Sequence, residues 1–305
     1  MANLKSIKSK ILSYKKTGTV THAMEAVSAV KMRKSQERAL SGRAYAAAAL
    51  SVLERLSGTA DVSRHPLMRE RNGKTAVVIV TSDKGLAGSL NSGVIRKIEQ
   101  ELKSRGLSKS DTVFAAIGRR GGDYFASRGY DVRIKQENVS DDIPEGGMRA
   151  VTQKIMEWHA AGEIGSCIVA YQNFISTFEQ TPSIRQLIPI LPEMLNEMVR
   201  GIRPARGKYA PQHESVHARP AAYNIEPDAD TVLSILLPRL LNIELFHTLL
   251  EAKASEHSAR MVAMKSATDK AKEMAQGLTR TFNKVRQAAI TREVSEITSG
   301  IEAMK

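Results

Sequence analysis

Few segments of this 305-residue chain combine residue types and spacing that could do chemistry. The best candidate is the glycine-bearing stretch from Gly85 to Asn91. It lies between a β-branched run and a helical pattern, where α/β proteins commonly bind phosphates. The stretch matches neither G-x-G-x-x-G nor G-x-x-x-x-G-K-S/T, and no acidic ribose partner follows at the expected distance. Because the tight packing of a strand-to-helix turn explains Gly85 and Gly88 without a ligand, we favour that structural interpretation.

The histidines and the single cysteine suggest no strong metal or nucleophile site. His213 and His217 have the spacing of a metal pair, but they lie in a predicted loop that supplies no cysteine and no third ligand. His257 lies on a helical run, where we expect an interhelical hydrogen bond. Cys167 stands in the apolar run from Ser166 to Ala170, so we expect a buried structural thiol.

Two carboxylate pairs could be interpreted as an acid and a base. One is Asp141 with Asp142, and the other is Glu293 with Glu296, three residues apart on one helix face. Nothing in the sequence places a nucleophile or a pocket beside either pair. The sequence therefore predicts no catalytic residue, no cofactor and no metal site.

The composition favours a soluble protein with an acidic partner. Lysine and arginine number 45 against 32 aspartate and glutamate residues, which gives a net charge of +13. A nucleic-acid partner is disfavoured because aromatic residues make up only 5% and no RNA-recognition or helix-turn-helix signature is present. No uninterrupted apolar run reaches the ~18 residues of a membrane span, and no signal-peptide pattern opens the chain.

Proline placement divides the chain into a head, a middle and a tail. All 10 prolines fall between Pro66 and Pro238, and only Gly277 and Gly300 interrupt the helix-forming tail. The tail therefore predicts one helix of roughly 90 Å, which needs a partner along its length. The proline-free head is the natural partner.

Apolar stripes indicate how the two helices should pack. In the head, Leu4, Ile7, Ile11 and Tyr14 form the first stripe. Val20, Ala23, Val27 and Val30 are predicted to continue a similar spacing, slightly out of phase with the first stripe. The predicted tail stripe is rich in alanine, which allows close approach of the two axes. Its members are Leu245, Leu249, Ala252, Glu256, Ala259, Ala263, Ser266, Lys270, Met274, Leu278, Val285 and Ala288.

The middle of the chain alternates between strand and helix patterns. Strands are predicted at 75–81, 112–118, 166–171 and 184–190, and helices at 94–102, 123–128 and 148–160. This alternation predicts a Rossmann-like α/β domain with a mostly parallel sheet, joined to an antiparallel coiled coil of the terminal helices. The predicted boundaries are 1–58 for the N-terminal helix, 74–200 for the α/β domain, 201–225 for a surface excursion and 226–305 for the C-terminal helix.

Several segments closely resemble the gamma subunit of bacterial F-type ATP synthases. In the tail these are 254–269 and 282–300. In the head they are Ile7–Lys8, 21–25 and 31–36, and in the middle 82–88. The resemblance covers both ends and the first strand of the middle, whereas residues 119–223 are interpreted from pattern alone.

The resemblance implies a non-catalytic rotor that couples proton flow to ATP synthesis. It implies that the coiled coil turns inside a ring of alpha and beta subunits, with the α/β domain beside the epsilon subunit and the c-subunit ring. It also implies a peripheral location on the cytoplasmic face of the bacterial membrane. The residues implied to contact the stator are Met24, Lys31, Arg33, Lys34, Arg286, Gln287, Thr291, Glu293 and Glu296. The alternatives left open are a phosphate-binding α/β enzyme and a basic nucleic-acid-binding coiled coil.

Overall fold

The computed structural model describes residues 4–41, 52, 65–69, 71–190, 226 and 228–304. The chain forms two compact units, one of residues 1–28 with 260–305 and one of residues 29–259. The predicted surface excursion at 201–225 lies outside the described residues, as does most of 42–58. The predicted fold class is confirmed, because two long terminal helices accompany a central five-stranded mixed sheet.

The two long helices are α1, Leu4–Ser41, and α7, Ala229–Ala303. Helix α7 begins nine residues before Pro238. The Asp228 side chain accepts hydrogen bonds from Thr231 N at 2.8 Å and Thr231 Oγ1 at 2.7 Å, which caps the first turn. Pro238 therefore lies inside the helix, where it removes one backbone hydrogen bond. Leu237 and Leu240, which are buried in the core of the α/β domain, offset this cost.

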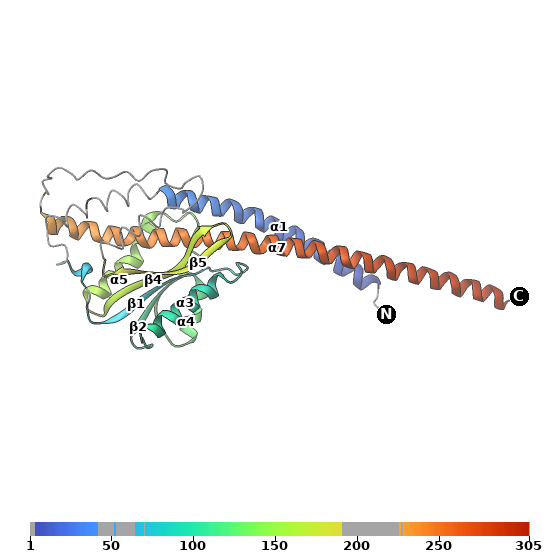
Figure 1. Ribbon diagram of the computed structural model, residues 1–305, viewed down its shortest axis with the longest axis horizontal. Coiled ribbons are helices and arrows are strands. Elements are labelled where there is room, and N and C mark those ends of the chain that lie inside the picture. Colours follow the sequence, from blue (N-terminus) through green and yellow to red (C-terminus); the bar gives the residue numbers. More distant parts are fainter. Residues whose placement is uncertain are drawn as a thin grey trace. The chain divides into compact units, whose positions relative to one another are not determined.

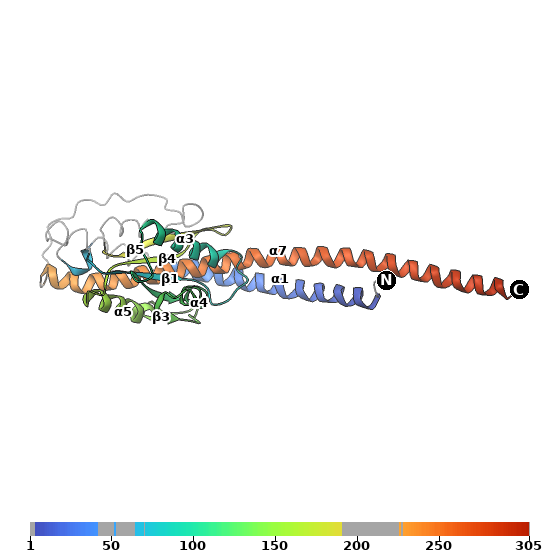
Figure 2. The ribbon, with the colours of Figure 1, turned by 90° about the horizontal axis from the view of Figure 1, so that it is seen from below.

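In the first unit, α1 and α7 pack as an antiparallel coiled coil (Figure 2). The Thr21 and Thr268 hydroxyls share a hydrogen bond of 2.6 Å, and Gly18 faces Ala271. Because the sequence numbers fall on one helix as they rise on the other, these contacts set the antiparallel register. Each hydroxyl has one proton, so one hydroxyl donates to the other. The accepting hydroxyl donates to a backbone carbonyl of its own helix, Thr17 O or Met264 O, and both buried hydroxyls therefore have a partner.

The packed faces differ from the predicted stripes. The head stripe is correct through Tyr14, but it continues through Gly18, Thr21 and Ser28, whereas Val20 and Val27 are 58% and 56% exposed. These buried positions keep the alternating steps of four and three that a coiled coil requires. The physical reason for the error is that close approach of the helices selects small residues, so the bulkier valines are a misleading guide to the interface.

The tail stripe needs the same correction. In the first unit the buried positions of α7 are Arg260, Met264, Thr268, Ala271 and Ala275, with Leu278 and Val285 half-buried as predicted. Other predicted members are exposed: Ser266, Lys270, Met274 and Ala288. The predicted members Leu245, Leu249 and Ala252 are buried, but they pack into the core of the α/β domain in the second unit rather than against the head helix.

Gly18 gives a test of this close packing. A methyl group added at Gly18 would lie 3.6 Å from Ala271 Cβ, an ordinary contact. We expect Gly18→Ala to raise the free energy of unfolding by up to ~1 kcal/mol, because alanine favours the helix. Gly18→Leu should instead lower it by roughly 1 to 3 kcal/mol through overpacking. Denaturant unfolding of the full-length chain measures both, and Gly277→Ala on the open face of α7 is the control. Equal stability of the alanine and leucine variants would contradict this packing.

The second unit contains the sheet, whose strand order is β3-β2-β1-β4-β5. The strands are β1 (Lys74–Val80), β2 (Thr112–Ile117), β3 (Asp131–Gln136), β4 (Ile164–Ser176) and β5 (Glu179–Ile188). The first four are parallel, and β5 runs antiparallel to β4. Strand β3 was not predicted, because its residues alternate between exposed and half-buried at the sheet edge and lack an apolar run.

Helices cover both faces of this sheet. One face packs against α3 (Leu90–Ser104) and α4 (Arg119–Ser127), through Ile98 and Phe125 among others. The other face packs against α5 (Arg149–Ala160) and against Leu233 to Ala252 of α7 (Figure 1). The first part of α7 is therefore a core helix of the α/β domain. Short 3-10 turns at Pro66–Met68 (η2) and Glu145–Met148 (η3) complete the unit.

Candidate functional site

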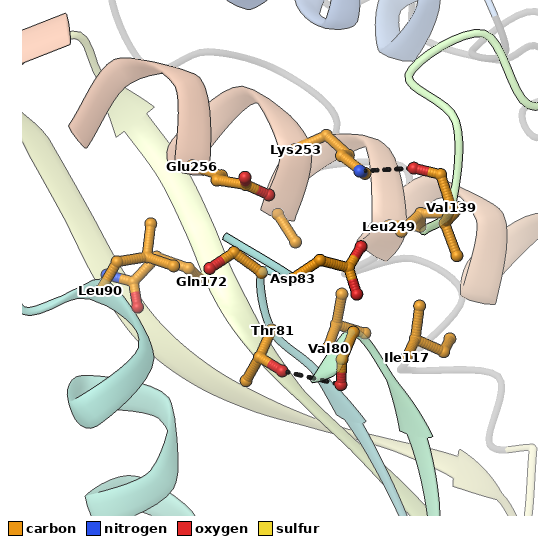
Figure 3. Close-up of a pocket in the computed structure, with 13 residues that line it drawn as sticks. Val80, Thr81, Asp83, Leu90, Ile117, Val139, Gln172, Leu249, Lys253 and Glu256 are labelled. Atoms are coloured by element: carbon orange, nitrogen blue, oxygen red, sulfur yellow. Dashed lines mark hydrogen bonds between the residues drawn. The ribbon is translucent and has the colours of Figure 1, made fainter. Parts of the chain in front are cut away.

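The crevice at the carboxyl ends of β1 and β2 is the position where an α/β fold would bind a phosphate. Figure 3 shows that Lys253, Leu249 and Glu256 of α7 cover it, facing Thr81 and Asp83 from the end of β1. The remaining space is about 10 Å³, enough for roughly one water molecule. A nucleotide or a phosphate ester does not fit.

The polar groups of the glycine-bearing loop bond to one another. Asn91 accepts from Ser82 N at 2.9 Å and donates to Ser82 Oγ at 2.7 Å, while the Asp83 carboxylate accepts from Arg119 N at 3.0 Å. These bonds brace the turn from β1 into α3 and hold the start of α4. The arrangement agrees with the structural interpretation of Gly85 and Gly88.

The predicted carboxylate pairs lie in different surroundings. The hydrogen bond from His257, followed by that from Lys31, lowers the pKa of Asp141 well below its usual range. His257 bonds the loop carboxylate of Asp141 through Nε2 at 3.0 Å. Glu293 and Glu296 are exposed on α7, and Glu296 pairs with Arg292 at 2.7 Å.

No cluster of three or more potential metal ligands occurs in the described part of the chain. His213 and His217 lie outside the described residues. Cys167 is fully buried in β4, and burial raises the pKa of its thiol, as expected for a structural cysteine. Helix α7 contains one apolar window long enough to cross a membrane, but 61% of that window is buried inside the protein, as in the core helix of a soluble domain.

A buried charged cluster on α7 was not found from the sequence. Glu251 lies 3.6 Å from Arg185 of β5 and 3.6 Å from His247. The Arg185 guanidinium lies 5.1 Å from the centre of the Tyr171 ring. Glu244 is 6% exposed, and burial raises its pKa to about 7. The apolar pattern of α7 concealed these residues, because they lie beside the leucines that pack on the sheet.

The predicted stator-contact residues fall into three groups. Met24 is half-buried on α1 in the first unit, and Lys31, Arg33 and Lys34 are exposed on α1 in the second. The remaining five are all exposed on α7 in the first unit: Arg286, Gln287, Thr291, Glu293 and Glu296. In that unit, Thr268 marks the level of Thr21, so Arg286 lies about 27 Å further along the helix. Within the first unit, Met24 and these five residues therefore form no single compact site.

The end of α7 carries an unpartnered apolar stripe. Every residue from Ile290 to Met304 is exposed, and Figure 1 shows α7 continuing past the N-terminal end of α1. Ile290, Val294, Ile297 and Ile301 are between 52% and 63% exposed and recur at steps of four, three and four. We name these four residues the C-terminal apolar stripe. Such a stripe is typical of a helix that packs against a partner.

The fold and these surfaces define a class of protein. Its members combine a coiled coil of two long helices with a small α/β domain, and in this chain the exposed C-terminal apolar stripe is typical of a helix that binds a partner. The sequence model of a family described as ATP synthase matches residues 3–304. ATP synthase gamma chains of Heliobacterium modesticaldum and Geotalea daltonii are each 37% identical over the full length of both chains. That of Staphylococcus saprophyticus is 32% identical, also over the full length of both.

Solved structures agree on the fold. A chain of the Euglena gracilis mitochondrial ATP synthase (OSCP, F1 and c-ring) has a TM-score of 0.64 at 14% identity. The match covers 99% of this chain and 94% of that one. A chain of the Tetrahymena thermophila mitochondrial ATP synthase central stalk and c-ring has a TM-score of 0.58 at 22% identity, covering 81% of this chain and 99% of that one. The chain belongs to the ATP synthase gamma-chain family, and it is a subunit of a membrane-associated ATP synthase complex. The resemblance stated from the sequence is confirmed.

Proposed function

We propose that this chain is the non-catalytic rotor of a bacterial ATP synthase, located at the cytoplasmic face of the cell membrane. Its partners are the alpha and beta subunits of the catalytic ring, the epsilon subunit and the c-subunit ring. Proton flow turns the c ring and this chain with it, and the turning coiled coil imposes different states on the catalytic sites of the beta subunits. The chain itself binds no substrate and no cofactor.

The observation that carries the proposal is the C-terminal apolar stripe on the unpaired end of α7. A single helix that exposes an apolar face is only marginally stable in water. We therefore expect a partner surface to cover this segment. A ring that encloses the helix would cover the stripe. The filled crevice at the sheet edge supports a mechanical role over catalysis.

Residues on both helices are the proposed stator contacts, and all of them except Met24 are polar and exposed. Arg286 and Gln287 with Thr291, Glu293 and Glu296 present charges and hydrogen-bonding groups around the apolar stripe. On α1, Lys31, Arg33 and Lys34 add positive charge, which would attract acidic loops, and the half-buried Met24 would add an apolar contact. Exposed pairs of this kind are individually weak, at about 0 to 1 kcal/mol, which allows a contact to break and re-form as the rotor turns.

The test replaces apolar residues of the stripe by a charge. Ile297→Asp with Ile301→Asp should reduce ATP-driven torque and ATP synthesis at least several-fold in the reconstituted complex, because carboxylates would have to enter an apolar contact. Ser299→Asp, on the opposite side of the same turn, is the matched control and should have a smaller effect. Removal of all residues after Thr281 should cause a larger loss. If assembly, torque and coupling all survived that removal, this segment would not be the transmitting element.

A further inference from the structure

Two neighbouring aspartates in the loop between β3 and η3 are held by cations from both long helices. This loop, residues 137–144, lies in the second unit together with residues 29–41 of α1 and 229–259 of α7. The Asp141 carboxylate accepts from Lys31 Nζ of α1 at 2.8 Å and from His257 Nε2 of α7 at 3.0 Å. Lys253 Nζ of α7 lies 3.4 Å from the same carboxylate. One side chain thus joins the loop to both helices.

Backbone contacts reinforce the joint. Lys253 Nζ donates to Val139 O at 2.8 Å (Figure 3), and the Arg38 guanidinium donates to Asp141 O at 2.6 Å and also to Ile143 O. Asp142 pairs with Lys34 at 2.7 Å and lies 3.8 Å from Arg38, both from α1. Asp142 therefore ties the loop to α1, whereas Asp141 ties it to α1 and α7 together.

Burial makes the two aspartates unequal. The Asp141 side chain is 23% exposed and its partner His257 is 4% exposed, whereas Asp142 is 63% exposed. Ion pairs at the surface contribute little, but a partly buried carboxylate among several cations contributes more, and its loss leaves those cations facing one another. Four lysine and arginine side chains surround the two aspartates, so Asp141 is needed to balance the local charge.

We propose that Asp141 is a positioning residue for rotary coupling: it locks α1, α7 and the α/β domain together so that they turn as one body. The inference rests on the proposed rotor function. Torque delivered to the α/β domain must reach both helices, and a joint that contacts both prevents one helix from slipping against the other. Lys31 and Lys34 then serve inside the chain, in addition to any contact with the stator.

The experiment compares Asp141→Asn with Asp142→Asn in the complete ATP synthase reconstituted in vesicles. It measures both ATP hydrolysis and proton pumping per ATP hydrolysed. We expect Asp141→Asn to keep hydrolysis within about twofold of the wild type but to lower the pumping ratio at least threefold. Asp142→Asn should leave the ratio unchanged. A purely structural role would lower the amount of assembled complex without changing the ratio in the complexes that form, and that outcome would overturn the proposal.

A second variant keeps the proposal testable if Asp141→Asn assembles poorly. Lys31→Met removes the contact between the Asp141 carboxylate and α1 at a half-exposed position. It should lower the pumping ratio in the wild-type background and cause no further loss in the Asp141→Asn background. If the losses in pumping ratio from Lys31→Met and Asp141→Asn were additive, Lys31 would act through the stator, and the proposed role of its contact with Asp141 would be wrong. If the wild-type chain itself neither rotated nor pumped, the proposed rotor function would fail. If the wild type pumped and Asp141→Asn pumped equally well, the inference about Asp141 alone would fail.

Discussion

Gly118→Ala is expected to lower the free energy of unfolding by at least ~3 kcal/mol, because two costs add at this position. Gly118 has a φ of 92°, a left-handed conformation that an L side chain rarely adopts. A methyl group there would also lie 1.9 Å from Thr81 O, far inside van der Waals contact. The clash is with backbone at the end of β1, so it cannot be relieved by rotating a side chain.

The surroundings of Gly118 explain why the loss of stability should extend beyond this residue. Gly118 N donates to Gln136 O at 2.8 Å, and Gly121 N donates to Thr81 Oγ1 at 2.9 Å, so the glycine fixes the ends of β1, β2 and β3 relative to α4. Moving Thr81 would disturb these bonds together. Denaturant unfolding of the full-length chain measures the loss.

Gly88→Ala is the matched control for Gly118→Ala. Gly88 also has a positive φ, 58°, but a methyl group there meets nothing within 4 Å. It should therefore cost only about 1 kcal/mol, the expense of the backbone conformation alone. If the two variants were equally stable, the close approach of Gly118 to Thr81 would not be a structural requirement.

Replacement of Glu244 by glutamine is expected to change how stability depends on pH. Burial is the main cause that raises the pKa of Glu244 to about 7, and the nearby Glu251 carboxylate adds to it, while Arg185 opposes it. In the unfolded chain the pKa is near its ordinary 4.5. The folded state therefore binds a proton between about pH 4.5 and 7 that the unfolded state does not. The stabilisation is fully present near and below pH 4.5 and is lost as the pH rises through 7.

The difference between these two pKa values corresponds to roughly 3 kcal/mol. We expect the free energy of unfolding of Glu244→Gln, relative to the wild type, to rise by about that amount between pH 5 and pH 8, since glutamine never ionises. Other groups that titrate in this range are common to both chains, so their contributions largely cancel in the difference. Glu293→Gln, an exposed position on the same helix, should show no such change. Parallel pH profiles for the wild type and Glu244→Gln would mean that Glu244 remains ionised in the folded protein.

The buried cluster around Glu244 also bears on the rotor proposal. Glu244, His247 and Glu251 lie on the part of α7 that packs on the sheet, beside Arg185 and Tyr171. A helix that carries torque must resist rotation about its own axis in this core. Directional contacts between charged groups resist such rotation better than leucine packing alone. These buried groups would lower the free energy of unfolding near neutral pH, but they would hold α7 more rigidly on the sheet.

The sequence alone was sufficient for much of the fold. Local signals decide whether a segment is helix or strand, so the absence of proline from the ends and the alternation of β-branched and helical runs predicted both long helices and four strands. Strand β3 was missed, because half-exposed edge residues such as Asp131 and Arg133 do not form an apolar pattern. The family followed from the residues of the tail, in particular 254–269 and 282–300, because they match motif positions directly.

Tertiary structure alone decided which faces pack and which groups meet. Gly18 and Thr21 lie in the coiled-coil interface, whereas Val20 does not. The reason is that the distance between the two helices depends on the side chains of both α1 and α7, and not on the hydrophobicity of one helix. Asp141 gains its role from Lys31 and His257, which lie more than 100 residues away in each direction. The sequence determined the elements and the family, since these depend on local pattern. The joint at Asp141 and the proton on Glu244 depend on desolvation and charge contacts that exist only after distant segments have come together.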